Sequence, residues 1–393
     1  RRRTPPARQQ RHVNVHHGKN VQNVRLDEGA VGDDHAQIDG LATMDVEQLV
    51  DRVPHRKAQS SGAFLDRTGH QFGPPTATLV GAGDDVDHVD AIVQVGNAGA
   101  LGTGAITFNG GTTNNYGVYT NALITANNIT VTGTASATVA GYIAQVQALT
   151  INSGSTGGDI TITATGASAG GGNGLYQSGA ITGANGSNIT FTSNNTITQS
   201  GAISLAANTS GNVATITYDT TAGTKASTIT AGALTITSGS TSDINFVMKS
   251  AGSALNPNTI GTSSSRLPGT VTIDNTYGGS SPASGYVTTS NISTAATASA
   301  GVTINNAIYT TKLVSIKGIS YTSQGVNYSA VINASAGGVE ITGTTYNNYG
   351  VYTSNASLIT GNFITINGVG AVAVAGWIDY IGALTINSGA TGG

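Results

Sequence analysis

The sequence predicts an all-β protein: a right-handed parallel β-helix (β-solenoid) preceded by a mostly irregular N-terminal segment. Three observations support this fold class: very short strand signals that recur along the chain, clusters of Gly, Asn and Ser between them, and one long segment that occurs twice. Sandwiches and propellers also contain short strands, but a nearly verbatim repeat of a long segment favours a stack of coils. Parallel crossover connections are right-handed in nearly all proteins, which gives the predicted handedness.

The strand signals are apolar–polar–apolar triplets, the period-2 pattern of a strand with one buried face. Thr usually occupies the middle position, where a β-branched polar residue suits the solvent side. Gly and Asn between the triplets tolerate the left-handed backbone conformation that tight corners require. The triplets are centred on Thr107, Thr130, Thr150, Thr161, Thr190, Ser204, Thr215, Thr235, Asn245, Thr272, Thr303, Ser315, Glu340, Thr365 and Thr385.

The duplicated segment comprises residues 114–158 and residues 347–393. The heptamer NNYGVYT opens both copies at an offset of 347 − 114 = 233, and ALTINSG recurs near their ends at 383 − 148 = 235. Identity over seven residues at both ends indicates duplication rather than shared composition. We expect coils of roughly 20 residues over residues 96–393, which would give on the order of 15 coils rising about 70 Å.

Residues 1–95 form a separate segment by composition. They hold 11 of the 16 Lys and Arg residues, 13 of the 19 Asp and Glu residues and all 7 His residues. Only Thr43–Val53 predicts a helix, capped by Thr43 with an apolar face. The rest shows neither period, so we expect it to be irregular or disordered. We hypothesise that this segment is not native to residues 96–393, which a continuous native transcript across residues 90–102 would refute.

Composition argues against several classes of protein. The net charge of −3 provides no general attraction for nucleic acid. No run approaches 18 apolar residues, so no membrane-spanning helix is predicted, and no signal peptide is visible after Arg1–Arg3. The absence of Cys excludes a disulfide framework and a Cys-ligated metal.

No catalytic, cofactor-binding or metal-binding residue is predicted, and we expect no enzyme. Enzymes with a β-helix that act on polysaccharides need clustered carboxylates, whereas the 6 acidic residues after residue 95 are scattered, with no two within four positions. The glycine-rich run at residues 170–179 lacks the Asp of a calcium-binding repeat. His12, His16 and His17 lie where no helix is predicted, so a solvated tract is favoured over a zinc site.

The stretch GSNITFTSNNTITQSGAISLAANTSGNVATITYD (residues 186–219) and the shorter runs 117–133 and 154–166 share one rhythm. They resemble the repeat region of filamentous haemagglutinin-like exoproteins of Gram-negative bacteria, of the two-partner-secretion or autotransporter type. The resemblance covers about residues 96–393. It implies a fragment of a right-handed β-helix adhesin that is secreted or displayed on the cell surface, with an outer-membrane transporter outside this sequence. The secretion domain of that family has no counterpart here.

The expected function is therefore a structural or adhesive stalk that mediates attachment or aggregation through repeated weak contacts. The expected partners are host or matrix glycans or proteins, or like chains. The candidate ligand-contact residues are Tyr116 and Tyr349, placed at equivalent tips of the two copies, where an aromatic ring can stack on a sugar. A carbohydrate-active β-helix enzyme is one alternative.

An ice-binding solenoid is the other alternative. It would display Thr-x-Thr pairs in regular ranks on one flat face. The pairs begin at Thr130, Thr161, Thr190, Thr196, Thr215 and Thr235. The gaps between successive starts are unequal (161 − 130 = 31, 190 − 161 = 29, 196 − 190 = 6, 215 − 196 = 19 and 235 − 215 = 20). We expect a broken rank from these gaps, and the β-propensity of Thr explains the pairs without any ligand.

Overall fold

The computed structural model describes residues 11–17, 20–26, 77–80, 93–95, 104–139, 141–152, 156–167, 172–223, 227–252, 254–278, 281–282, 300–346, 348–353, 357–370 and 379–387. All regular elements within these ranges are strands. The chain divides into two units, Arg1–Pro54 and His55–Gly393. In the first unit, β1 (Arg11–His17) pairs antiparallel with β2 (Asn20–Leu26). The helix predicted at Thr43–Val53 lies outside the described residues.

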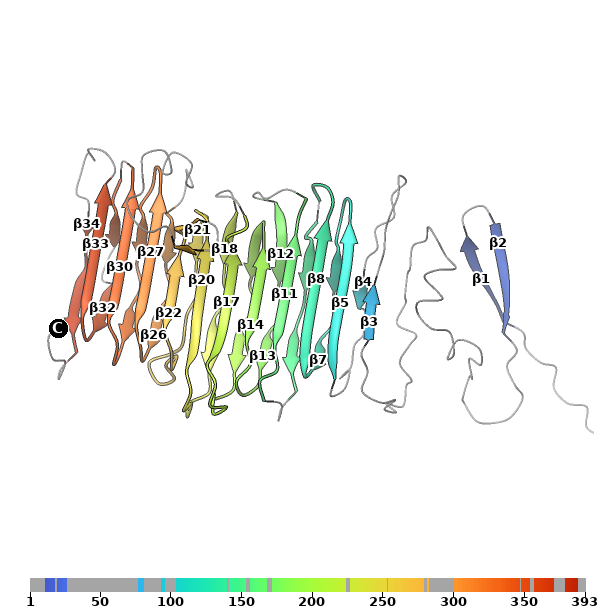
Figure 1. Ribbon diagram of the computed structural model, residues 1–393, viewed down its shortest axis with the longest axis horizontal. Coiled ribbons are helices and arrows are strands. Elements are labelled where there is room, and N and C mark those ends of the chain that lie inside the picture. Colours follow the sequence, from blue (N-terminus) through green and yellow to red (C-terminus); the bar gives the residue numbers. More distant parts are fainter. Residues whose placement is uncertain are drawn as a thin grey trace, which may run out of the picture. The chain divides into compact units, whose positions relative to one another are not determined.

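The second unit is a parallel β-solenoid of about 9 turns. Figure 1 shows the strands of its sheet 1 side by side, from β5 to β33. Sheet 1 contains β3 (Ala77–Val80), β5 (Ala105–Thr112), β8 (Asn128–Ala135), β11 (Ile160–Thr165), β14 (Ile189–Ser193), β17 (Ala214–Thr220), β20 (Ile244–Ser250), β22 (Val271–Asp274), β27 (Val314–Ser320), β30 (Val339–Thr345) and β33 (Ile364–Gly370). The predicted parallel β-solenoid is thereby confirmed.

Two further sides complete each turn. Sheet 2 contains β4 (Val93–Val95), β6 (Val118–Thr120), β9 (Ala144–Val146), β12 (Asn173–Gln177), β15 (Thr196–Gln199), β18 (Thr228–Thr230), β21 (Ala254–Asn256), β25 (Val302–Ile304), β28 (Val326–Tyr328), β31 (Val351–Thr353) and β34 (Asp379–Tyr380). The third side begins with β7 (Ile124–Ala126), β10 (Leu149–Ile151), β13 (Ile181–Gly183), β16 (Ile203–Leu205) and β19 (Leu234–Ile236). It continues with β26 (Ile308–Thr310), β29 (Ile332–Ala334), β32 (Leu358–Gly361) and β35 (Ala383–Ile386). Single bridges through Ile260 link its two parts, and β23 (Tyr277–Gly278) and β24 (Ser281–Pro282) form a short hairpin.

The pairing in sheet 1 gives the length of each turn. Ile129 pairs with Ile106 and with Ile160, so the offset along the chain is 129 − 106 = 23 for one turn and 160 − 129 = 31 for the next. The longest turn, between Val271 and Val314, has an offset of 314 − 271 = 43. The prediction of about 15 short coils is therefore wrong, because a turn must supply up to three strands and the corners between them. About 9 turns rise about 40 Å at about 4.8 Å a turn.

The inward residues of the triplets fill a thin apolar core, as their alternation predicts. Phe191, Tyr218 and Phe246 pack ring against ring in three successive turns: Phe191 stacks on Tyr218 with centroids 4.7 Å apart, and Phe246 is tilted against Tyr218 at 5.6 Å. The hydroxyl of Tyr218 donates to Oε1 of Gln199 at 2.9 Å, and Nε2 of Gln199 donates to Oε1 of Gln177 at 3.1 Å. Burial raises the pKa of Tyr218, so this hydroxyl stays protonated and remains a hydrogen-bond donor.

Side chains also connect neighbouring turns at the corner that leads into sheet 1. Oδ1 of Asn128 accepts the backbone N–H of Asp159 at 2.9 Å, and Oδ1 of Asp159 accepts that of Asn188 at 3.1 Å. Oδ1 of Asn188 in turn accepts the N–H of Thr215 at 2.8 Å. Each polar side chain therefore satisfies a backbone donor of the next turn, which holds successive turns in register.

Candidate binding surfaces

Tyr116 and Tyr349 occupy equivalent corners between sheets 1 and 2, just before β6 and β31. Each ring packs on the tyrosine three residues later: Tyr116 on Tyr119 with centroids 5.2 Å apart, and Tyr349 on Tyr352 at 5.0 Å. All four side chains are half-buried. The two candidate residues are thus members of aromatic pairs on the surface of the solenoid and are not isolated tips.

The pair in the second copy is extended by a third ring. Tyr380 pairs in register with Tyr352, stacks on it at 5.5 Å and meets Tyr349 edge-on at 6.5 Å. The side chain of Tyr380 is 44% exposed. We name Tyr349, Tyr352 and Tyr380 the aromatic cluster. In the first copy, the residue paired with Tyr119 is Gln145, so the third ring is missing there.

A stacked pair continues the aromatic surface from the first copy into the following turn. Tyr142 and Tyr176 lie 4.9 Å apart at an interplanar angle of 21°, and Tyr176 pairs in register with Gln145. The outer face of sheet 2 therefore carries aromatic rings at both copies of the duplicated segment. The sequence contains these tyrosines, but their grouping depends on turn lengths that it does not reveal.

Sheet 1 carries a rank of alternating charges that sequence reasoning missed. Asp219, Lys249, Asp274 and Lys317 are consecutive partners in four successive turns. Nζ of Lys249 lies 2.9 Å from Oδ2 of Asp219, and Nζ of Lys317 lies 4.0 Å from Oδ2 of Asp274. Successive charged residues of this rank lie far apart in the chain, at offsets between 274 − 249 = 25 and 317 − 274 = 43. No local sequence motif therefore indicates that they become neighbours.

The two carboxylates of this charge rank are bound within the protein. Oδ1 of Asp219 accepts from the backbone N–H and the hydroxyl of Thr221 at 2.8 and 2.7 Å. Oδ1 of Asp274 accepts from the same groups of Thr276 at 2.8 and 2.6 Å. Each carboxylate is thus held by a hydroxyl, an N–H and an ammonium group. Such a carboxylate is better suited to fixing the register of the strands than to transferring protons.

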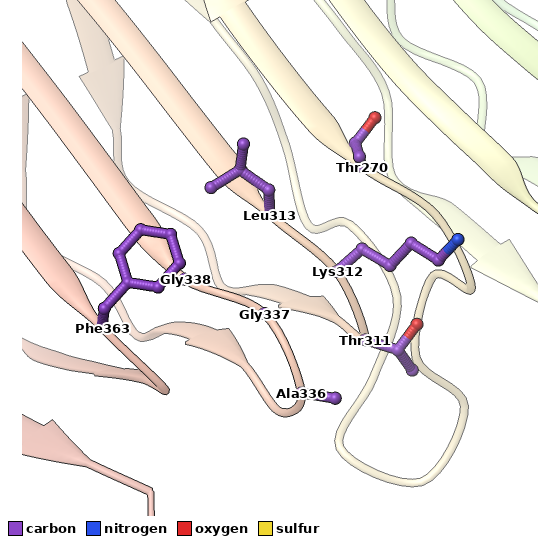
Figure 2. A pocket seen from close by; sticks show the side chains of 8 residues that line it. All are labelled: Thr270, Thr311, Lys312, Leu313, Ala336, Gly337, Gly338 and Phe363. Atoms are coloured by element: carbon purple, nitrogen blue, oxygen red, sulfur yellow. The ribbon is translucent and has the colours of Figure 1, made fainter. Parts of the chain in front are cut away.

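An open hollow of about 530 Å³ lies at the corner where the third side leads into sheet 1 (Figure 2). Phe363 lies beside Gly338, where an added Cβ would come within 2.2 Å of its ring. Lys312, the one charged residue of this lining, is paired with Asp243 through Nζ and Oδ2 at 2.6 Å. The hollow thus has an apolar floor, two Thr hydroxyls and a compensated cation, and offers no acid–base pair.

The Thr ranks are more regular than the sequence suggested. Thr107, Thr130, Thr161, Thr190 and Thr217 are consecutive partners in sheet 1. A second rank contains Thr132, Thr163 and Thr192. Three of the six pairs are thus in register, because loops and corners absorb the unequal gaps between them. The expected break lies beyond these turns, where Thr192 is followed by Asp219. Of the other pairs, Thr198 lies in sheet 2 and Thr235 on the third side.

Across the described ranges, no group of three or more His, Asp or Glu residues is arranged to hold a metal ion. The same residues include no helix that is long and apolar enough to span a membrane. The side chains of His12, His16 and His17 lie outside what the structure describes.

Comparison with models of protein families, with curated proteins and with solved structures finds no significant match for this chain. What the fold defines is the class of protein, a parallel β-solenoid repeat protein.

Proposed function

We propose that the solenoid is the structural and adhesive stalk of a bacterial protein that is secreted or exposed on the cell surface. It attaches to glycans or proteins of a host or matrix. The observation that carries this proposal is the aromatic cluster. Tyrosine rings offer apolar faces to the C–H faces of sugar rings, and their hydroxyls offer hydrogen bonds at the rim. The resemblance to filamentous haemagglutinin-like exoproteins supports the location and export through an outer-membrane transporter.

Several weak contacts on one solenoid add up to useful affinity. The aromatic cluster forms one surface at the second copy, and the Tyr116–Tyr119 and Tyr142–Tyr176 pairs form another at the first copy. When sites are linked, the second binding event becomes intramolecular, so avidity exceeds the affinity of each site. A polymeric ligand with repeating sugar units suits this arrangement.

The test is a glycan array, followed by titration calorimetry with the glycan that is retained most strongly. Tyr380→Ala should weaken binding roughly fivefold, because one aromatic contact contributes about 1 kcal/mol. Tyr309→Ala, which alters a half-buried tyrosine on the third side, is the matched control. Gln145→Tyr should strengthen binding because it supplies the third ring to the first copy. Equal affinities of the Tyr380 and Tyr309 variants would refute the proposal.

A second candidate function, the binding of ice or ordered water, is favoured by the two Thr ranks. Their hydroxyls and methyl groups form a fixed grid, with about 4.8 Å between turns and about 6.6 Å between alternate residues of a strand. Such a rigid array can impose its spacing on the adjacent water layer. The grid covers three consecutive turns in both ranks, at Thr130/Thr132, Thr161/Thr163 and Thr190/Thr192.

Thermal hysteresis measurements on the full chain test this candidate. Wild-type protein should separate the melting and freezing temperatures, and Thr161→Lys should abolish most of that gap by disrupting the centre of the grid. Thr235→Lys, on an exposed position of the third side, should leave the gap unchanged. Absence of hysteresis in the wild type eliminates ice binding and leaves adhesion.

The proposal includes no enzymatic activity. A carbohydrate-active solenoid would need free acid and base groups on one groove, whereas Asp219 and Asp274 are engaged by Lys and Thr side chains. Incubation of the retained glycan with the protein distinguishes the two cases, because an enzyme would shorten the glycan and an adhesin would leave it intact.

A further inference from the structure

One outward side chain per turn forms a continuous rank along the outer face of sheet 2. Consecutive partners in this sheet are Tyr119, Gln145, Tyr176, Thr198, Thr230 and Asn256, and then Thr303, Asn327, Tyr352 and Tyr380. The two runs meet at the pair Leu255 and Val302, which directly precede Asn256 and Thr303. We name these outward residues the sheet 2 rank. Each of them is half-buried or exposed.

The sheet 2 rank consists of Tyr, Thr, Asn and Gln residues and contains no charged side chain. Among the described strands of sheet 2, Asp379 is the one charged residue. Its carboxylate accepts the backbone N–H groups of Val351 at 3.1 Å and Gly368 at 3.0 Å. The described strands of sheet 1, by contrast, contain Asp219, Lys249, Asp274, Lys317 and Glu340. The two sheets therefore differ in charge.

The described cations of the solenoid lie outside sheet 2. Between residues 104 and 387, they are Lys249, Arg266, Lys312 and Lys317. Lys249 and Lys317 belong to the charge rank of sheet 1, and Lys312 pairs with Asp243. The guanidinium carbon of Arg266 lies 5.4 Å from the ring centre of Tyr309, on the third side. An acidic sugar on sheet 2 would therefore find no described Lys or Arg to pair with its carboxylate or sulfate group.

The interior of the sheet 2 rank combines aromatic and amide groups. Tyr119 and Tyr176 flank Gln145 in successive turns, so the two tyrosines lie about 10 Å apart along the rank with an amide between them. These three residues, like Thr198 and Thr230, belong to strands that have a paired strand on each side. Their exposure therefore does not depend on either end of the chain.

We propose that the outer face of sheet 2 binds an uncharged polysaccharide whose chain runs along the sheet 2 rank. This inference rests on the proposed function, because it names the ligand class and the binding face of the adhesive stalk. Tyrosine rings pack on the C–H faces of sugar rings, and Gln, Asn and Thr side chains exchange hydrogen bonds with sugar hydroxyls. An acidic polysaccharide is disfavoured, because an anion that is desolvated without a paired cation costs free energy.

The first test compares polymers that differ in charge but share a backbone: dextran with dextran sulfate, and hydroxyethyl cellulose with carboxymethyl cellulose. Neutral mannan, galactan and xylan complete the panel. At least one neutral polymer should retard the full chain in a native gel, and no charged polymer should bind more tightly. The affinity for the neutral polymer should change less than about twofold between low and high salt, because no ion pair is screened.

The outcomes of this comparison separate the inference from the proposed function. Retardation by charged polymers alone, or a tenfold loss of affinity at high salt, would overturn the inference and leave glycan adhesion standing. A chain that is retarded by no polymer and retained by no glycan of the array would refute both.

A pair of variants at Thr198, in the middle of the rank, reports the charge of the ligand directly. Thr198→Lys and Thr198→Glu place opposite charges at one half-buried position. Both should weaken binding of an uncharged polymer by factors that agree within about twofold, because such a ligand has no net charge to attract or repel. The matched controls, Thr150→Lys and Thr150→Glu on the outward position of β10, should bind like the wild type. Stronger binding by Thr198→Lys with weaker binding by Thr198→Glu would reveal an anionic ligand and overturn the proposal.

Two further variants test the binding face and the remaining cation. Tyr176→Ala should weaken binding roughly fivefold by removing one aromatic contact, whereas Tyr309→Ala on the third side should not. Lys225→Gln, which removes the one cation of residues 96–393 outside the described residues, should leave the affinity unchanged. Equal affinities of the two tyrosine variants, or a tenfold loss in Lys225→Gln, would overturn the proposal.

Discussion

The pKa values of two carboxylates, Asp219 and Asp379, are shifted in opposite directions by their surroundings. Burial alone would raise the pKa of Asp219, but the hydroxyl and N–H of Thr221 and the ammonium of Lys249 outweigh it, so the pKa lies below its ordinary value. Burial raises the pKa of Asp379, and the N–H groups of Val351 and Gly368 offset this only in part. The ionised form is thus favoured by folding at Asp219 and disfavoured at Asp379.

We predict that Asp219→Asn and Asp379→Asn change the pH dependence of stability in opposite directions. The stabilisation from Asp219 is present above its unfolded pKa of about 3.9 and is lost as the pH falls through the lower folded pKa. That from Asp379 is present below about 3.9 and is lost as the pH rises through the higher folded pKa. Both variants lose hydrogen bonds, since Asn offers one acceptor oxygen where Asp offers two. As the pH rises from acidic to neutral, the deficit in melting temperature relative to the wild type should therefore widen for Asp219→Asn and narrow for Asp379→Asn. Each effect should stay below about 1 kcal/mol, since both groups are partly exposed.

Circular dichroism melts of the wild type and both variants, from acidic to neutral pH, provide the measurement. The wild-type chain is the common reference, and the two variants serve as controls for each other because they make the same chemical change. A deficit in melting temperature that widens with pH for both variants would contradict opposite pKa shifts of the two carboxylates.

At the scale of elements, close backbone contacts define the corner between sheets 1 and 2. A Cβ on Gly343 would lie 1.8 Å from the carbonyl oxygen of Gly350, and the same contact occurs from Gly110 to Gly117 at 1.9 Å. A third pair, Gly318 and Gly325, repeats it at 2.0 Å, with the same spacing of seven residues in the chain (350 − 343 and 325 − 318). A corner with the same close contact therefore occurs a third time in the chain. The sequence alone did not reveal it, because little of the duplicated segment except the glycines is kept there.

We predict that Gly343→Ala lowers the free energy of unfolding by about 2 kcal/mol or more, because the added methyl group must push β30 and β31 apart. Gly172→Ala is the matched control: its Cβ would meet nothing closer than a side-chain oxygen at 3.6 Å, so its effect should stay within about 0.5 kcal/mol. Urea denaturation followed by circular dichroism measures both. Similar unfolding midpoints for the two variants would show that the corner tolerates a wider separation.

The duplication is structural as well as sequential. Nδ2 of Asn152 donates to Oδ1 of Asn127 at 2.7 Å in the first copy, and Nδ2 of Asn387 donates to Oδ1 of Asn362 at 3.0 Å in the second. Asn387 and Asn362 each lie 235 residues after their counterparts in the first copy (387 − 152 = 235 and 362 − 127 = 235). The two copies therefore fold as the same unit, and the differences between them, such as Tyr380 in place of Gln145, are the differences to test for function.

At the scale of the whole second unit, the solenoid is held together by contacts between successive turns. Each strand of sheet 1 within the stack pairs with the strands of the turns before and after it, so stability is shared among neighbours as in other repeat proteins. This arrangement explains why turns of unequal length coexist, with offsets of 129 − 106 = 23 and 160 − 129 = 31 between paired isoleucines. Strands must match their neighbours, whereas the loops between them are free to vary in length.

The sequence by itself determined the all-β class, the parallel stacking and the positions of most strands. Each triplet, such as that around Thr161, specifies locally which side chains face inward, and the duplicated segment specifies stacking. It also singled out Tyr116 and Tyr349, which do lie at equivalent positions. Only the tertiary structure decided the number of turns, the Tyr380 contact and the Asp219–Lys249–Asp274–Lys317 rank. These features depend on which residues of different turns become neighbours. Because the loops differ in length, the spacing of residues along the chain does not predict that pairing.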